Sequence, residues 1–329
     1  MSAASKPLAV AVTDILDARK VVNRYLSPTP TIQPASLSAE LGFNITLKCE
    51  NLQPIGAFKI RGGVNLLSRL DDEVLEKGVV TASTGNHAQS IAYAAKLVGT
   101  RAVIYMPEDP NPLKAAAVRR LGGEIIEHGP DFDSCNEAAK DHADREGMRY
   151  VHPGNEPHLI AGVGTYALEL IEAEPHLDTV IVPVGGGSGV CGTATVFKAM
   201  SPSTKVIAVQ TANMPAVYDS FHQKKLISHS GGQTWAEGLA TRVAFEMPFE
   251  MMQELVDDVV LVSENDMREA MLDLMEAAHI VAEGAGAASL AAAKNMASDL
   301  QGQNVGLIVS GGNVTLDTIR RAVCSDEPW

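Results

Sequence analysis

The chain has 329 residues, of which 46% are hydrophobic and 20% are charged, and its formal net charge is −14. This length and composition predict a soluble globular protein of about two domains, each large enough to bury a core. The acidic balance excludes nucleic acid and anionic membrane surfaces as general partners, whereas a small anion can still bind in a local cleft.

The cysteines are far apart and form no C-x-x-C pair, which argues against a zinc ribbon or a redox motif. They are Cys49, Cys135, Cys191 and Cys324. We expect reduced thiols in a cytoplasmic protein. The charged N-terminal stretch does not resemble a signal peptide, and no uncharged run approaches the ~18 apolar residues of a membrane span.

The first half of the chain alternates expected strands and helices. Residues 10–26 have the apolar spacing of a helix, and 44–50 alternate like a strand. A helix is expected over 64–70, followed by strand 78–83 and helix 87–99, with Gly99 as its C-cap. A strand at 101–108, a helix at 115–123 and a strand at 123–129 complete this half. Alternating strands and helices predict parallel βαβ units.

The same alternation returns after residue 178, with expected strands at 178–184, 205–211 and 304–310. The fold class is therefore α/β, with two open parallel sheets. We expect the smaller domain, residues 73–152, to be inserted in a larger one made of 1–72 and 153–329. The sequence ends at Trp329, soon after the last expected helix, so we expect no additional C-terminal regulatory domain.

Polar or glycine-rich segments follow several expected strands, where ligands bind in open α/β sheets. Gly185-Gly186-Gly187-Ser188-Gly189 lies between a strand and a helix, and such a loop suits a phosphate. Ser83-Thr84-Gly85-Asn86-His87 suits a carboxylate or a ring oxygen, although Ser83 or Thr84 could also simply cap the helix. Glu283-Gly284-Ala285-Gly286 and Ser310-Gly311-Gly312-Asn313 are two further candidates.

Two further features of the sequence need an explanation. Gly187, Gly189 and Gly192 form G-x-G-x-x-G, but the next strand ends in Gln210 rather than the acid of a dinucleotide site, which weakens a dehydrogenase interpretation. Residues 54–63 read PIGAFKIRGG, with small residues on both sides of Lys59. A solvated lysine needs no such neighbours, so we expect a flat cofactor to approach the backbone there.

Five ordered motifs, AFKIRGG, ASTGNHAQS, PVGGGSG, AEGAGAASLA and SGGNV, resemble the fold-type-II pyridoxal-phosphate enzymes. Within them the chain is similar to the threonine/serine dehydratase and serine racemase branch, and His87 favours elimination over β-replacement. The resemblance covers nearly the whole chain. It implies a tryptophan-synthase β-subunit-like fold, pyridoxal 5'-phosphate as cofactor, an amino-acid substrate and a homodimer.

The resemblance also implies roles for individual residues. Lys59 would bond to the cofactor aldehyde and take the α-proton, which requires a lowered pKa. Catalysis would involve Lys59, Ser83 and Thr84, and substrate binding Ser83, Thr84, Gly85, Asn86 and His87. The cofactor would contact Lys59, Phe58 on the ring, Asn86 at the ring hydroxyl, Gly185 to Gly189 at the phosphate, Gly238 on one face and Ser310 at the ring nitrogen. Glu283 would lie near the substrate or the ring edge.

The implied reaction is α,β-elimination of a β-hydroxy amino acid such as L-threonine or L-serine, giving a 2-oxo acid and ammonia. Ser310 fits this reaction, because a neutral hydroxyl makes the ring a weaker electron sink than a carboxylate would and favours prompt loss of the β-hydroxyl group. The sequence leaves open 3-hydroxyaspartate, phenylserine or a hydroxyectoine-derived amino acid as substrate, and amino-acid racemisation as reaction. A catalytically silent binding module is the alternative from another class.

Three positions depart from the branch. Thr84 stands where the racemases have a serine, which puts racemisation in doubt, and Ser188 replaces the fourth glycine of the phosphate loop. Gln210 and Ala216, with Met214 between them, stand where metal-dependent members carry acidic ligands. Divalent cations prefer carboxylate oxygens, so we expect no metal at this place.

Overall fold

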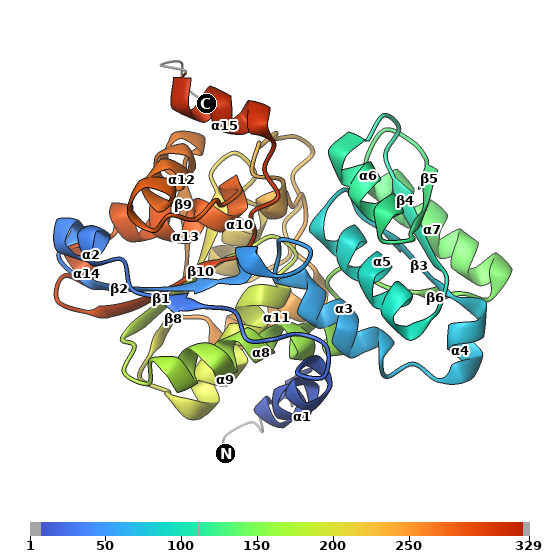
Figure 1. Ribbon diagram of the computed structural model, residues 1–329, viewed down its shortest axis with the longest axis horizontal. Coiled ribbons are helices and arrows are strands. Elements are labelled where there is room, and N and C mark those ends of the chain that lie inside the picture. Colours follow the sequence, from blue (N-terminus) through green and yellow to red (C-terminus); the bar gives the residue numbers. More distant parts are fainter. Residues whose placement is uncertain (1–7, 111, 325–329) are drawn as a thin grey trace.

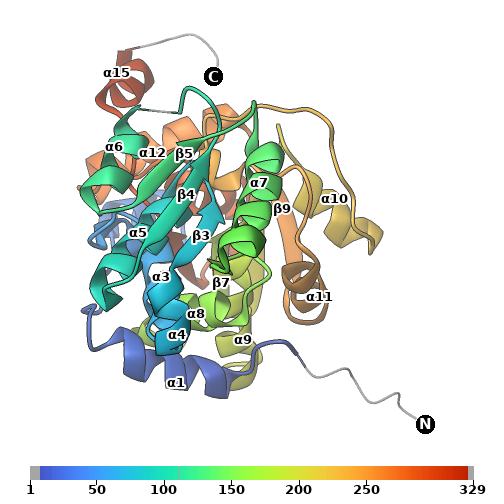
Figure 2. The ribbon, with the colours of Figure 1, turned by 90° about the vertical axis from the view of Figure 1, so that its right-hand side faces the viewer.

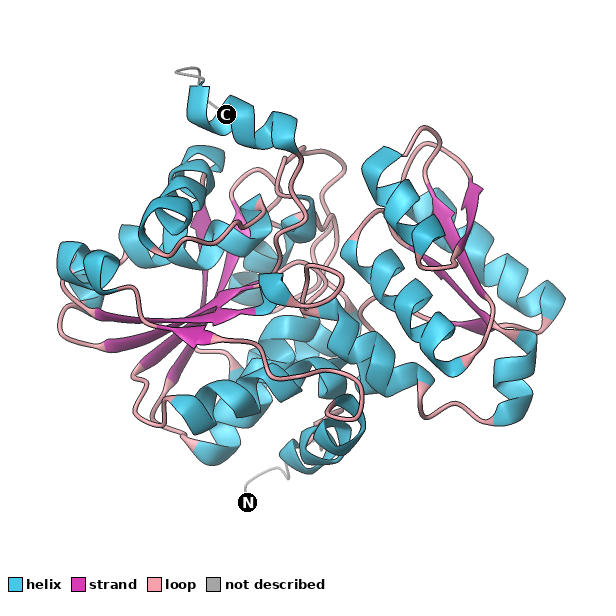
Figure 3. Ribbon diagram, in the orientation of Figure 1, coloured by secondary structure: helices cyan, strands magenta, loops and turns pink. Residues whose placement is uncertain are grey.

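The computed structural model describes residues 8–110 and 112–324. Two separate groups of strands, each flanked by helices, lie side by side (Figures 1 and 3). The fold class is α/β, as predicted, and the two sheets are formed mainly of parallel strands. The expectation of no additional C-terminal domain was based on the position of Trp329, which lies outside the described residues.

The larger sheet has six strands in the order β1-β2-β10-β7-β8-β9. β1 at the edge pairs antiparallel with β2, and the other pairs are parallel. The strands are β1 (Thr31–Ile32), β2 (Asn44–Cys49), β7 (Thr179–Pro183), β8 (Lys205–Thr211), β9 (Asp258–Val262) and β10 (Asn304–Val309).

Alternate residues of the central strands face two helical layers, because successive strand side chains point to opposite faces. Val180 and Val182 lie in a core with α1, α8, α9 and α11, whereas Ile181 lies in a core with α2, α12, α13 and α15. The first layer contains α1 (Val12–Val22), α8 (Pro157–Ala173), α9 (Ser188–Met200) and α11 (Glu246–Leu255). The second contains α2 (Ala35–Leu41), α12 (Glu264–Ala277), α13 (Gly284–Asn295) and α15 (Leu316–Cys324).

The smaller sheet has four parallel strands in the order β5-β4-β3-β6. They are β3 (Val79–Ala82), β4 (Ala102–Met106), β5 (Glu124–Glu127) and β6 (Arg149–Tyr150). Helices α5 (Asn86–Val98) and α6 (Pro112–Arg120) cover one face and α7 (Phe132–Glu146) the other (Figure 2). All four strands lie within the segment predicted for the smaller domain, and the domain boundaries themselves stay a prediction.

Short elements connect these layers. They are η1 (Glu50–Leu52), α3 (Lys59–Leu67), α4 (Asp72–Lys77), α10 (Ala216–Gln223), η2 (Glu237–Leu239) and α14 (Ala297–Leu300). Helix α3 passes between the two halves of the molecule and contacts α5 on one side and α8 on the other (Figure 1). It begins at Lys59 itself, five residues before the helix expected from the sequence. No helix among the described residues is long and apolar enough to span a membrane.

Candidate active site

A cavity of about 1090 Å³ lies between the two halves and is lined by residues from both. Ser83 follows β3, Gly185 lies two residues after β7, and Ser310 follows β10, so the lining includes the carboxyl ends of three strands. The structure places every sequence-predicted site residue on this lining: Phe58, Lys59, Ser83, Thr84, Gly85, Asn86, His87, Gly185, Gly186, Gly187, Ser188, Gly189, Gly238, Glu283 and Ser310. Their individual roles stay predictions.

The amine of Lys59 is enclosed within this cavity. Burial lowers the pKa of Lys59 to about 8, because the charged ammonium loses its hydration. Its Nζ atom donates a hydrogen bond of 2.9 Å to Oγ of Ser188 and lies 5.3 Å from the centre of the Phe58 ring. The neutral fraction of this amine near neutral pH is therefore much larger than that of a hydrated lysine, as a nucleophile or a proton acceptor requires.

The glycine-rich loop forms an anion site at the start of α9. No backbone N–H group of Gly185 to Gly189 donates a hydrogen bond to another described residue. Gly187 has φ +90°, a conformation that L side chains rarely adopt, and Ser188 is the first residue of the 13-residue helix. Free N–H groups and the positive end of the helix dipole favour a phosphate or a similar anion here.

The segment after β3 forms a second group of donors. Ser83 Oγ accepts hydrogen bonds of 3.2 Å from the backbone N–H groups of Gly85 and Ala88, so this side chain caps α5. The backbone N–H groups of Asn86 and His87 have no acceptor among the described residues. Thr84 is exposed toward the cavity. A helix start with free N–H groups suits a carboxylate.

His87 is buried and uncharged. Burial lowers its pKa to about 3, with smaller contributions from Lys59 and His152. Thr81 Oγ1 donates to the carbonyl of Val151 at 2.7 Å, so it accepts the hydrogen bond from Nε2 of His87 at 3.1 Å. This pairing fixes the neutral tautomer with the proton on Nε2, and that nitrogen is engaged with Thr81 rather than with a substrate.

Asn86 belongs to a chain of hydrogen-bonded polar side chains, of which Asn86 and Glu283 line the cavity. Its Nδ2 donates to Oε1 of Glu283 at 2.7 Å, and its Oδ1 accepts from Nδ2 of Asn313 at 2.7 Å. Asn313 also donates to the carbonyl of Ile55 at 2.9 Å. Burial raises the pKa of Glu283 to about 7, against the opposing effects of Lys114 and Asn86. Asn313 thus orients the Asn86 amide, a role that sequence reasoning missed although the SGGNV motif contains this residue.

The remaining predicted cofactor contacts are Gly238, Phe58 and Ser310, which line the same cavity. Gly238 lies against Gly185, since a side chain on Gly185 would collide with the carbonyl of Gly238. The Phe58 ring meets Tyr166 edge-on, with 6.1 Å between ring centres. The backbone N–H of Phe58 donates to the carbonyl of Ser310 at 3.0 Å. The strand end that carries Ser310 and the turn that carries Lys59 are therefore tied together.

The sequence-based expectation that Gly62 and Gly63 let a flat cofactor approach the backbone is wrong. A side chain on Gly62 would lie 2.9 Å from the carbonyl of Leu159 in α8, and one on Gly63 would lie 2.7 Å from the carbonyl of Ser90 in α5. These glycines allow two helices to approach α3 closely, and no cofactor needs to be invoked for them. Gly56, before the lysine, has φ +68° and adjoins Asn313.

The segment where a metal site was considered has another arrangement. Oε1 of Gln210 accepts hydrogen bonds of 3.0 Å from the backbone N–H groups of Val217 and Tyr218. The amide therefore caps the start of α10. No group of three or more potential metal ligands of the types His, Cys, Asp and Glu occurs among residues 8–110 and 112–324. The absence of a metal stays a prediction for experiment.

Several charged and aromatic side chains at the cavity were not predicted. Arg242 pairs with Asp131 at 3.1 Å, and Lys114 pairs with Glu237. Both pairs join the smaller half to the larger one across the cavity. Neither pair has a sequence signal, because its members lie 111 and 123 residues apart.

A family model described as "Pyridoxal-phosphate dependent enzyme" matches residues 22–311. The chain belongs to the pyridoxal-phosphate-dependent enzymes. An L-threonine ammonia-lyase from Thermotoga maritima is 40% identical over 95% of this chain and 78% of its own length. A catabolic L-threonine dehydratase from Staphylococcus aureus is 39% identical over 94% of this chain and 91% of its own length.

Solved structures of this family have the same fold. Maize serine racemase superimposes with a TM-score of 0.91 and 35% identity, covering 96% of this chain and 97% of the maize chain. The processed threonine deaminase isoform 2 of Solanum lycopersicum gives a TM-score of 0.90 and 33% identity, covering 94% and 91%. The fold is therefore that of fold-type-II pyridoxal-phosphate enzymes, as predicted, and the dehydrogenase interpretation is excluded.

The cavity fits pyridoxal 5'-phosphate, the cofactor of this family. The free N–H groups of Gly185 to Gly189 match a phosphate, and the Lys59 amine, bonded to Ser188 in the same loop, lies within reach of a molecule held there. Ser310 and Asn86 line the same cavity as this lysine. We find no charge that would repel a phosphate within the loop itself, which contains only glycine and serine.

Proposed function

We propose that this protein catalyses α,β-elimination of a β-hydroxy amino acid such as L-threonine or L-serine, releasing a 2-oxo acid and ammonia. The observation that carries the proposal is the enclosed Lys59 amine with its pKa lowered to about 8, placed beside a loop of free N–H groups. The identity to an L-threonine ammonia-lyase over most of the chain supports the same reaction.

The protein groups divide the reaction between them. When bound, pyridoxal 5'-phosphate supplies an electron sink for the pair left at the α-carbon. Nζ of Lys59 accepts the α-proton, because near neutral pH part of this amine is unprotonated. The α-proton and the β-hydroxyl group leave as water, and a later addition of water releases ammonia.

The start of α5 orients the substrate. Its free backbone N–H groups at Asn86 and His87 hold the substrate carboxylate, with the hydroxyl groups of Ser83 and Thr84 beside them. Neutral His87 adds no charge of its own at pH 7. Ser310 offers a hydroxyl rather than a carboxylate to the cofactor ring, which favours elimination over transamination.

The test is a substrate panel with the purified, cofactor-loaded protein. L-threonine, L-serine, 3-hydroxyaspartate and phenylserine are supplied separately. The 2-oxo acid and the ammonia released are measured, and equal amounts of the two are expected. Turnover of at least one of these amino acids, lost in Lys59→Ala, is expected. A protein that binds the cofactor and turns over none of them would instead favour the silent binding module.

Racemisation is a second candidate because maize serine racemase is 35% identical and Thr84 presents a hydroxyl to the cavity. A racemase needs a proton donor on the side opposite Lys59, and Thr84 would supply it. Chiral chromatography of the unreacted amino acid tests this candidate. A D-enantiomer that disappears in Thr84→Val but not in Thr84→Ser would support it.

We also propose a homodimer in the cytoplasm. Leu52 and Val281 are exposed apolar side chains on adjoining segments, which Asn51 joins by donating to the carbonyl of Val281 at 3.0 Å. The four cysteines are free, as in a reducing compartment. Light scattering after gel filtration, with Leu52→Asp as the interface variant, tests the dimer, and cell fractionation tests the location.

A further inference from the structure

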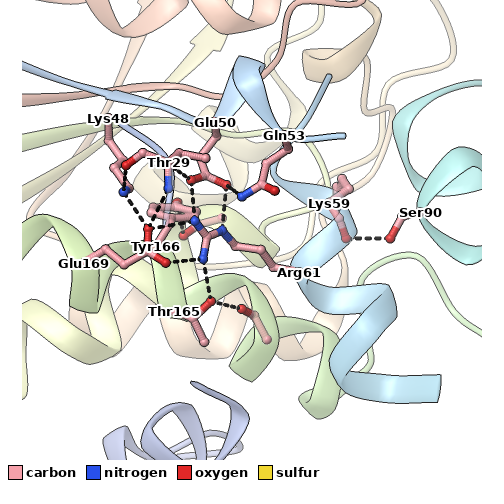
Figure 4. Close-up of polar contacts among 12 residues, drawn as sticks. Thr29, Lys48, Glu50, Gln53, Lys59, Arg61, Ser90, Thr165, Tyr166 and Glu169 are labelled. Atoms are coloured by element: carbon pink, nitrogen blue, oxygen red, sulfur yellow. Dashed lines mark hydrogen bonds and ion pairs between the residues drawn. The ribbon is translucent and has the colours of Figure 1, made fainter. Parts of the chain in front are cut away.

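Four charged side chains are enclosed where α3, β2, η1 and α8 meet (Figure 4). The side chains of Arg61, Glu50 and Lys48 are 0%, 0% and 1% exposed, and that of Glu169 is 10% exposed. The cluster contains two positive and two negative charges and is therefore neutral. None of these residues lines the cavity, so the proposed chemistry has not used them.

Arg61 uses all five of its N–H donors within this cluster. Nε and Nη2 donate to the two oxygens of Glu50 at 2.7 and 2.8 Å. Nη1 and Nη2 donate to the two oxygens of Glu169 at 2.6 and 2.8 Å. The fifth hydrogen bond, from Nη1 to Oγ1 of Thr165, is 3.1 Å long. Two bidentate pairs fix both the position and the plane of the guanidinium.

The partners of Arg61 are themselves held. Lys48 donates to Oε2 of Glu169 at 2.6 Å and to the carbonyl of Thr29 at 2.8 Å, and Thr29 Oγ1 donates to Oε1 of Glu50 at 2.6 Å. Burial opposes the charge on Arg61, but the charges and hydrogen bonds of Glu50 and Glu169 outweigh it, so the pKa of Arg61 is raised. The guanidinium is consequently charged throughout the working range of pH.

These partners come from the framework of the larger half. Lys48 is in β2, Glu50 is in η1, and Thr165 and Glu169 are in α8. Arg61 itself lies in the first turn of α3, two residues after Lys59, which is the first residue of that helix. Side chains two positions apart point in nearly opposite directions on a helix. Lys59 therefore lines the cavity, whereas Arg61 points to the framework, where Figure 4 shows its contacts with Glu50 and Glu169.

The first turn of α3 has few other attachments. No side chain caps its N-terminus. The backbone of Phe58 is tied to Ser310, and the carbonyl of Lys59 accepts a hydrogen bond of 2.6 Å from Ser90 Oγ in α5. Nζ of Lys59 donates to Ser188 Oγ in the larger half, and Arg61 supplies the only ion pairs that this turn makes with that half among the described residues.

Stability alone is a weak reason for such a cluster. Four charges lose their hydration on burial, and well-packed apolar side chains of similar volume often give equal or greater stability. Apolar side chains, however, do not fix an angle and a distance as two bidentate pairs do. The cluster is therefore better explained if a neighbouring group must be held in a fixed position. Lys59, two residues away, is such a group.

We propose that Arg61, clamped by Glu50 and Glu169, is a positioning residue that sets where the amine of Lys59 lies in the cavity. This inference rests on the proposed function in one respect, namely that Lys59 is the reactive amine. It does not depend on which amino acid is the substrate. A displacement of a reacting group by about 1 Å can lower a rate about a hundredfold.

The test is Arg61→Lys, which keeps the charge but replaces a planar fork of five donors by a single ammonium group. Below the melting temperature of the variant we expect kcat to fall about ten- to a hundredfold with KM nearly unchanged, since the groups that hold the substrate carboxylate are intact. In the absence of any amino acid, we expect a lower rate of cofactor attachment to Lys59 and a shifted visible absorption band.

The matched control is Arg101→Lys. Arg101 also pairs bidentately with a carboxylate, Glu124, with both distances 2.8 Å, but the side chains are 50% and 53% exposed and are not part of the cavity lining. Wild-type kcat and a wild-type absorption band are expected for this control. The same results for Arg61→Lys would overturn the proposal and leave the cluster a role in stability alone.

A charge-free variant separates positioning from stability. Lys48→Met, Glu50→Leu, Arg61→Met and Glu169→Leu together remove the cluster without leaving an unpaired charge. We expect this protein to fold and to take up the cofactor, but with the same losses as Arg61→Lys. Wild-type kcat would overturn the proposal. Failure of both variants to fold would also overturn it, because the cluster would then serve folding.

Failure of the proposed function gives a different result. If no β-hydroxy amino acid is turned over by the wild type, the cofactor-attachment rate and the absorption band still report on the Lys59 amine. A difference between Arg61→Lys and Arg101→Lys in these two measurements supports the positioning role whatever the substrate is.

Discussion

In the proposed function Lys59 has two roles at one atom, since it would both bond to the cofactor and accept the α-proton. Lys59→Ala removes both functions, so we expect 2-oxo acid formation to fall by several orders of magnitude with any good substrate. The measurement is a continuous assay of 2-oxo acid with the fully folded variant. Near-normal turnover would show that another lysine is the reactive one.

The lowered pKa of Lys59 predicts how the cofactor is taken up at different pH values. Only the unprotonated amine carries the electron pair that bonds to an aldehyde. The rate of cofactor attachment to cofactor-free protein should therefore rise with pH and level off above about 8, where burial places the pKa of Lys59. Stopped-flow absorbance at several pH values measures this. A rise that continues toward pH 10.5 would mean that the amine is hydrated.

Glu283 predicts a dependence of stability on pH. Burial raises its pKa in the folded protein to about 7 from 4.5. Between these values the unfolded chain loses the proton while the folded protein retains it, so this residue lowers stability as the pH rises from about 4.5 to 7. Glu283→Gln lacks the effect. The melting temperature of the variant minus that of the wild type should increase over this range and then stay constant.

At the scale of elements, the contacts of α3 decide which glycines tolerate a side chain. Gly63→Ala would place a methyl group 2.7 Å from the carbonyl of Ser90, a backbone atom that cannot turn aside. We expect a loss of about 1–3 kcal/mol in the free energy of unfolding, although alanine favours helix more than glycine does. Urea denaturation measures it.

Gly231→Ala is the control for this comparison, because no atom lies within 4 Å of the position of its added methyl group. Little change in the free energy of unfolding is expected for it. Equal values for the two variants would mean that α3 and α5 separate at little cost.

The start of α3 also shows where prediction from sequence fails. The helix expected from the sequence begins only after Gly62 and Gly63, two residues of low helix propensity. Their close contacts with α5 and α8 outweigh the intrinsic preference, so α3 begins at Lys59. By contrast, α5 was predicted almost to the residue, because its apolar spacing is regular and Gly99 ends it with φ +74°.

For the whole molecule, the repeated strand–helix alternation was sufficient to predict two parallel sheets, and five motifs were sufficient to predict the family. The motifs lie at strand ends, which the fold brings to one cavity. The Arg61 cluster was not predicted, since Glu169 is 108 residues away in sequence. The role of Asn313 in orienting Asn86 was missed because the Asn86 amide lies 227 residues earlier. Neither contact leaves a periodic or local pattern.

The arrangement of α10 predicts that the intact protein is insensitive to chelators. The side-chain oxygen of Gln210 is already engaged by two backbone N–H groups, and Ala216 offers no side-chain ligand. We expect EDTA to leave both kcat and the melting temperature unchanged. Loss of activity in EDTA that magnesium or calcium restores, and potassium does not, would contradict this.

The free N–H groups of Gly185 to Gly189 also bear on how the protein is handled in the laboratory. A set of donors at a helix start does not distinguish the phosphate of the cofactor from inorganic phosphate or sulfate. Such ions in a buffer compete for this loop and slow reconstitution, so a preparation in phosphate buffer is liable to be under-loaded. Exchange into a buffer without tetrahedral oxyanions should raise the cofactor occupancy reached at a fixed cofactor concentration. The cofactor content of a sample then depends on its buffer as well as on the protein.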